Sequence, residues 1–104
     1  MIKVYNKLVR DRIPEIIDAS GAKCKTRILS DSEYLKMLDK KLDEELAEYH
    51  KDQSIDELAD LLEVIYAATI AHGYTLDALE TIRTEKAEKR GSFDEKIFLI
   101  EVEE

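Results

Sequence analysis

Residues 58–71 form the most apolar stretch of the chain, and Asp60 and Glu63 are its only charged residues. Read as a helix, this stretch is apolar almost all the way round, which is typical of a helix in the middle of a structure. A carboxylate beside a buried helix face costs several kcal/mol unless it is paired, protonated or bound to a cation. The rest of the chain must therefore cover this helix, and some partner must neutralise its carboxylates.

Hydroxyl side chains mark the starts of three long helices. Residues 30–33, Ser-Asp-Ser-Glu, have the form of a capping box, and residues 54–57, Ser-Ile-Asp-Glu, repeat it. Glycines follow the second and third helical stretches, as they often do at helix ends. The predicted long helices run from Ser30 to about Lys51, from Ser54 to Gly73 and from Thr75 to near Gly91.

Shorter segments surround these helices. Asp11 can cap a short helix that ends at Gly21, with Pro14 tolerated in the first turn. Residues 23–29 are interpreted as an extended connector, and residues 95–104 are apolar enough to pack or to form a short strand. Short connections between long helices favour antiparallel neighbours. The sequence therefore predicts one all-α domain over residues 1–104, an antiparallel helical bundle with short extended terminal segments.

The size and charge of the chain indicate which partners to expect. Because two or three long helices enclose little core, we expect a homo-oligomer, a dimer or tetramer, to complete the bundle. The net charge of −8 argues against a nucleic acid polymer as a partner. No apolar run reaches the length of a membrane span and the amino terminus lacks a signal peptide, so we expect no membrane partner and a cytoplasmic location.

Four carboxylates on the first two long helices form the candidate metal site. Glu45 and Glu48 lie one turn apart beside the apolar stripe of the first helix, whereas Glu44 points nearly opposite its centre. Glu57 and Asp60 begin the smaller-residue face of the second helix. Oxygen donors from two antiparallel helices suit Mg²⁺, with Mn²⁺ as the alternative. In a purely structural alternative, Glu57 completes its capping box and the other carboxylates pair with lysines or are solvated.

Basic residues provide a possible counterpart to this acidic group. Helical projection continues the apolar stripe of the third helix through Arg83, Lys86 and Arg90, so that these cations aim toward the acidic cluster. Lys7 and Arg10 belong to a second basic group near the amino terminus. Cations beside a metal suit a polyphosphate, although helix-dipole and surface salt-bridge roles are equally open alternatives.

Two acidic motifs and their flanking segments resemble the MazG-like and phosphoribosyl-ATP pyrophosphohydrolase superfamily of all-helical nucleotide pyrophosphohydrolases. The motifs are Glu-Glu-x-x-Glu at residues 44–48 and Glu-x-x-Asp at residues 57–60. The opening NKLVRDRIPEII and the later EKAEKRGSF extend the resemblance over most of the chain. The connection between the two motifs is shorter than is usual in the superfamily.

The resemblance implies Mg²⁺-dependent hydrolysis of a nucleoside triphosphate or related nucleotide between its α and β phosphates. Carried over, Glu45, Glu48, Glu57 and Asp60 hold the metal, Glu44 assists or orients water, and Lys86, Lys89 and Arg90 contact phosphate. One alternative is a phosphoribosyl-ATP pyrophosphohydrolase of histidine synthesis. Another is a non-catalytic helical interaction module.

Overall fold

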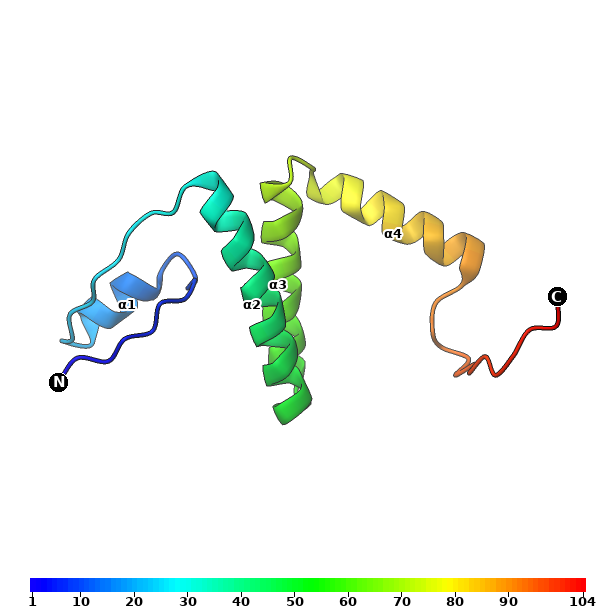
Figure 1. Cartoon of the computed structure of the whole chain (residues 1–104), viewed down its shortest axis with the longest axis horizontal. Helices are drawn as coiled ribbons and strands as arrows, with labels where there is room; N and C mark the ends of the chain where they lie inside the picture. Colours follow the sequence, from blue (N-terminus) through cyan, green and yellow to red (C-terminus); the bar gives the residue numbers. More distant parts are fainter.

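The structure is a computed structural model that describes all 104 residues. It contains four α-helices and no strand, so the prediction of an all-helical chain is confirmed (Figure 1). The helices are α1 (Ile13–Ala19), α2 (Asp31–Asp52), α3 (Ile55–Ala71) and α4 (Leu76–Arg90).

The starts of the long helices follow the predicted capping residues. Ser30 forms a complete capping box at α2, in which its side chain accepts from the backbone N–H of Glu33. The hydroxyl groups of Ser54 and Thr75 likewise accept a hydrogen bond from a backbone N–H in the first turn of α3 and α4, without the reciprocal bond of a capping box. The predicted short helix with Pro14 in its first turn is present as α1 and ends just before Gly21, but its predicted cap was wrong: Arg12 rather than Asp11 precedes the helix, and no side chain caps it.

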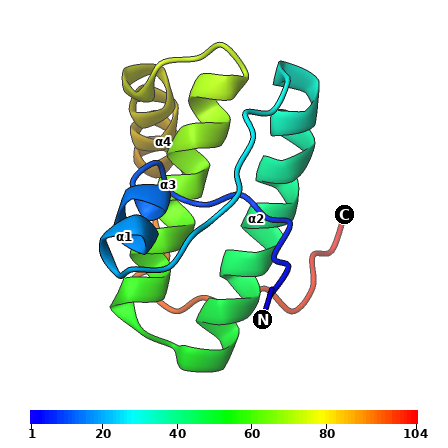
Figure 2. The same ribbon diagram turned by 90° about the vertical axis from the view of Figure 1, so that its left-hand side faces the viewer.

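Helices α2 and α3 form an antiparallel hairpin, which Figure 2 shows nearly face on. The turn between them is two residues long, and Gln53 closes it in the left-handed conformation, with φ of 53°. Leu38 of α2 and Val64 of α3 are the only two buried residues of the chain. The hairpin is therefore the packed part of the molecule, and its core within one chain is thin.

Helix α4 leaves the hairpin at the far end of α3 and projects away from it (Figure 1). The chain consequently extends over 61 × 31 × 24 Å. Every residue after Arg90 is exposed, including Phe93, Phe98 and Ile100. The prediction that residues 95–104 pack or form a strand is wrong for the single chain, because no other element lies against them. A bundle larger than the α2–α3 hairpin is not present within one chain.

None of the four helices combines the length and the apolar character that crossing a membrane requires.

Candidate metal centre

Three predicted ligands converge near the turn of the hairpin. Carboxylate oxygens of Glu45, Glu57 and Asp60 all lie within 4.8 Å of one another. Glu45 comes from α2, whereas Glu57 and Asp60 are one turn apart near the start of α3. The side chain of Glu45 is only 12% exposed, so this group reaches into the hairpin interface. We call these three residues the inner acidic cluster.

A second group of carboxylates continues toward the turn. Oxygens of Glu48, Asp52 and Glu57 also lie within 4.8 Å of one another. Glu57 belongs to both groups and therefore links Glu48 to the inner acidic cluster. Sequence reasoning missed Asp52, although its position one turn after Glu48 was a signal that could have found it.

Glu57 is the most crowded of these carboxylates. Partial desolvation raises the pKa of Glu57, and the charges of Asp60, Asp52, Glu48 and Glu45 raise it further. Its backbone N–H donates to the Ser54 hydroxyl at 3.3 Å, but its side chain does not complete a capping box. The carboxylate is therefore left facing the other acidic groups.

Glu44 is separated from the cluster by lysine partners. Its carboxylate accepts from Lys41 at 3.2 Å and from Lys7 at 3.4 Å. Partial burial favours a higher pKa for Glu44, yet the hydrogen bonds and charges of Lys41 and Lys7 together outweigh it and lower the pKa. Lys41 also lies 3.3 Å from Glu45 and so connects Glu44 to the edge of the inner acidic cluster.

The amino-terminal segment brings a second cation directly to the cluster. The Arg10 guanidinium donates to the Asp60 carboxylate over 2.7 Å, although the two residues are fifty positions apart. Figure 2 shows this segment crossing in front of the hairpin. Lys7 and Arg10, which the sequence suggested as possible phosphate contacts, thus lie at the acidic site.

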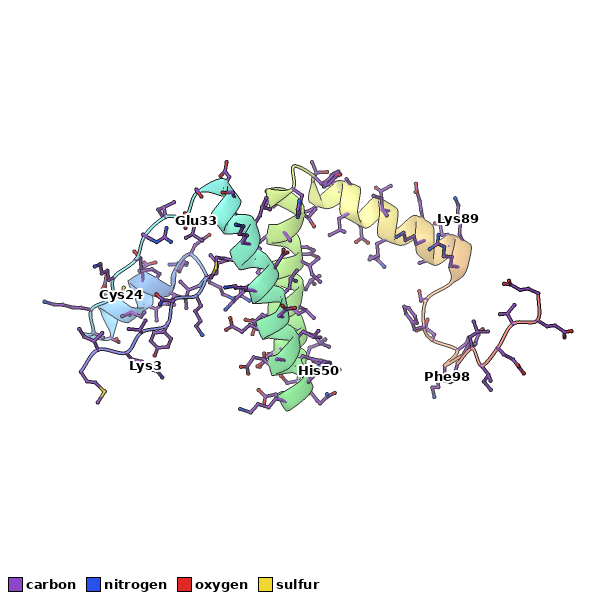
Figure 3. All side chains as sticks on the ribbon, viewed as in Figure 1. Lys3, Cys24, Glu33, His50, Lys89 and Phe98 are labelled. Atoms are coloured by element: carbon purple, nitrogen blue, oxygen red, sulfur yellow. The ribbon has the colours of Figure 1, made fainter.

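The basic residues of α4 are placed differently from the expectation. Figure 3 shows Lys89 at the far end of α4, well separated from His50 near the turn of the hairpin. Lys86, Lys89 and Arg90 form no ion pair with any residue of the chain, and Arg83 pairs with Glu80 of its own helix. The prediction that these cations aim toward the acidic cluster is wrong within one chain, because α4 leads away from the hairpin.

The donor atoms of the acidic site fit a hard divalent cation. The two groups offer carboxylate oxygens alone, with no histidine or cysteine among them. Clustered anionic oxygens suit Mg²⁺ or Mn²⁺, whereas softer metals favour nitrogen and sulfur ligands. A cation would also relieve the mutual repulsion that raises the pKa of Glu57.

Comparison with known proteins adds one partial similarity. An uncharacterised protein of Mycolicibacterium smegmatis (strain ATCC 700084 / mc(2)155) is 64% identical over 42 residues. These residues make up 40% of this chain and 43% of the relative, so the chain spans less than half of the relative's length. No protein-family model matches the chain, and no solved structure matches it.

Proposed function

We propose that this chain is a Mg²⁺-dependent nucleotide pyrophosphohydrolase, with Mn²⁺ as the alternative cation. It hydrolyses a nucleoside triphosphate or related nucleotide between the α and β phosphates and releases a monophosphate and pyrophosphate. The observation that carries this proposal is the convergence of Glu45, Glu57 and Asp60 from two helices. The resemblance of both acidic motifs to the MazG-like superfamily supplies the reaction type.

The proposed metal ligands are Glu45, Glu48, Glu57 and Asp60, with Asp52 within reach of the same group. A bound divalent cation supplies charge neutralisation for the phosphates and a lowered pKa for a coordinated water. The carboxylates of the chain position that cation and offer an acceptor for the proton of the attacking water.

Cations of the amino-terminal segment have a proposed role in binding the substrate. Arg10 lies against Asp60 and Lys7 lies against Glu44, so both reach the rim of the acidic site. A guanidinium group can bind a phosphate through two parallel hydrogen bonds, as it does a carboxylate. In the proposed complex Arg10 and Lys7 therefore exchange carboxylate partners for phosphate oxygens, while Glu44 orients water.

A substrate panel tests the proposal. Purified protein is incubated with nucleoside triphosphates and with phosphoribosyl-ATP, each with Mg²⁺ and with a chelator, and monophosphate and pyrophosphate are quantified. We expect Mg²⁺-dependent release of both products, and the preferred substrate distinguishes the two enzymatic alternatives. A non-catalytic helical module predicts no turnover of any substrate.

Two matched variants connect turnover to the site. Glu57→Gln removes the carboxylate shared by both acidic groups, and we expect activity to fall by at least about a hundredfold. Glu63→Gln makes the same chemical change at an exposed position on the same helix, outside both groups, and should retain activity. Equal activity in the two variants would contradict the metal assignment.

A further inference from the structure

Tyr5 is an exposed aromatic residue with two lysines over its ring. The Lys3 ammonium lies 5.0 Å from the ring centroid of Tyr5, and the Lys7 ammonium lies 5.6 Å from it. Ammonium groups at such distances are attracted to the face of an aromatic ring. Tyr5 is 62% exposed, and no aromatic ring of the chain stacks on it. The ring is therefore available to a flat ligand that displaces the flexible lysine side chains.

Lys7 places this ring beside the acidic site. The same Lys7 ammonium lies 3.4 Å from the Glu44 carboxylate, so one cation contacts both the ring and the first acidic motif. Three positions later, Arg10 reaches Asp60 of the inner acidic cluster over 2.7 Å. The segment is thus held to both helices of the hairpin, in front of which it crosses in Figure 2. A single ammonium group therefore separates the ring of Tyr5 from the rim of the site.

No other exposed aromatic ring of the chain has such a position. Tyr74 belongs to the link before α4, and Phe93 and Phe98 belong to the tail after it. Figure 3 shows Phe98 at the opposite end of the molecule from Lys3, which lies over Tyr5. Within one chain, a ligand anchored at the hairpin carboxylates therefore meets an exposed ring at Tyr5.

The order of these groups in space matches the order of the parts of a nucleotide. A nucleotide carries its base beyond the phosphate chain, joined to it through one ribose. Carboxylates suit a metal that holds phosphates, an ammonium group suits a phosphate oxygen, and an aromatic face suits a base. An inorganic polyphosphate would use the carboxylates and the ammonium group but not the ring. The exposed ring therefore favours a ligand that carries a base.

We propose that Tyr5 stacks on the base of the nucleotide while Lys3 and Lys7 turn from the ring to the phosphates. This inference rests on the proposed function, because it requires a nucleotide at the acidic site, and it adds the residue that contacts the base. Stacking tolerates every base, since each has a π-face. Tyr5 therefore separates nucleotides from inorganic polyphosphates rather than one base from another.

Calorimetric titration with uncleavable ligands tests this role. The ligands are the α,β-methylene triphosphates of adenosine, guanosine, cytidine and uridine, and the corresponding methylene-bridged triphosphate without a nucleoside, each with Mg²⁺. Tyr5→Ala should weaken binding of the nucleotide analogues about tenfold and leave binding of the bare triphosphate unchanged, because only the contact with the base is lost. Tyr5→Phe keeps the ring and should bind like wild type. Lys7→Gln should weaken binding of both kinds of ligand.

Tyr74→Ala is the matched control, because Tyr74 is 65% exposed and follows the end of α3, whereas the acidic groups lie near its start. Equal affinities of Tyr5→Ala and Tyr74→Ala for the nucleotide analogues would overturn the role of Tyr5 without touching the proposed hydrolysis. An equal loss for nucleotide and bare triphosphate would also overturn it. A selective loss in Tyr5→Ala supports this role even if the substrate panel shows no turnover. A wild-type protein that binds none of the nucleotide analogues would overturn both proposals.

Discussion

At the scale of single residues, Glu57 is the carboxylate most strongly repelled by its neighbours. Four other carboxylates raise its pKa, and no cation of the chain pairs with it. A proton relieves this repulsion, and so does a divalent cation, which makes the two compete for the same position. Acidic conditions should therefore weaken metal binding, because the raised pKa of Glu57 lets it take up a proton before most carboxylates do.

Replacing Glu57 separates these effects. Without metal, Glu57→Gln should leave the free energy of unfolding unchanged or slightly higher, because one of the repelling charges is gone. For the wild-type protein, Mg²⁺ at a hundred times its Kd should add about 2.7 kcal/mol of stability. Thermal unfolding with Mg²⁺ and with a chelator measures both quantities. The variant should show no Mg²⁺-induced rise in Tm, and a full rise would exclude Glu57 as a ligand.

In the proposed metal site, Arg10 would compete with the cation for the Asp60 carboxylate when no nucleotide is bound. Arg10→Gln should therefore bind free Mg²⁺ about two- to fivefold more tightly, since an exposed ion pair contributes up to about 1 kcal/mol. The same variant should bind nucleotide more weakly, because a phosphate contact is lost. Calorimetric titration measures both affinities. Arg12→Gln is the control, since Arg12 pairs only with Glu15, and matching affinities in the two variants would contradict this role.

At the scale of helices, local chemistry explains why much of the fold was predictable. Ser30, Ser54 and Thr75 satisfy the first N–H groups of their own helices, so a few neighbouring residues determine where each helix begins. The placement of Glu45 beside Glu57 follows from the periods of two helices and the short turn that joins them. α1 has no such cap, and its start at Ile13, directly after Arg12, was therefore not visible in the sequence.

The start of α2 should be sensitive to acid. A hydrogen bond from Arg27, reinforced by Ser30, holds the pKa of Glu33 at about 2, below its ordinary value of 4.5. A lowered folded-state pKa stabilises the fold above the ordinary value, and this stabilisation disappears as pH falls from about 4.5 to about 2. The stability difference between wild type and Arg27→Gln should shrink over that range in urea unfolding. Lys23→Gln, at an unpaired position in the preceding segment, should show no comparable pH dependence.

The hairpin turn offers a stabilising substitution. Gln53 has φ of 53°, a conformation that glycine adopts without the steric cost imposed by a Cβ atom. Gln53→Gly should raise the free energy of unfolding by about 0.5 kcal/mol, after allowing for the greater chain entropy of glycine. Lys51→Gly, inside the last turn of α2, should instead lower it by about 0.5–1 kcal/mol. Urea unfolding at one protein concentration measures both changes, and a loss in both would contradict this assignment.

At the scale of the whole molecule, the direction of α4 was the least predictable feature. The basic stripe of Lys86 and Arg90 appeared to face inward because helical projection relates residues within one helix only. Where the helix goes depends on the link after Gly73 and on contacts with other elements, and α4 has few such contacts in one chain. The contact between Arg10 and Asp60 could not be predicted for the same reason, because helical periodicity does not relate residues that lie fifty positions apart on different elements.

Assembly should make the stability of the protein depend on its concentration. If copies complete each other's core, dilution favours separated chains that retain little buried apolar surface. We expect Tm to rise steadily as protein concentration is raised a hundredfold. Differential scanning calorimetry across that range measures the change. A Tm that stays constant over the hundredfold range would contradict the expected homo-oligomer.

The projecting α4 and the exposed segment after it have a consequence for the abundance of this protein in a cell. A newly made chain that has not met a copy displays Phe93, Phe98 and Ile100 on an extended segment, the kind of surface that chaperones and proteases recognise. If the expected homo-oligomer covers this segment, each surviving molecule would require an encounter between two chains, and the amount of folded protein would rise more than linearly with the rate of synthesis.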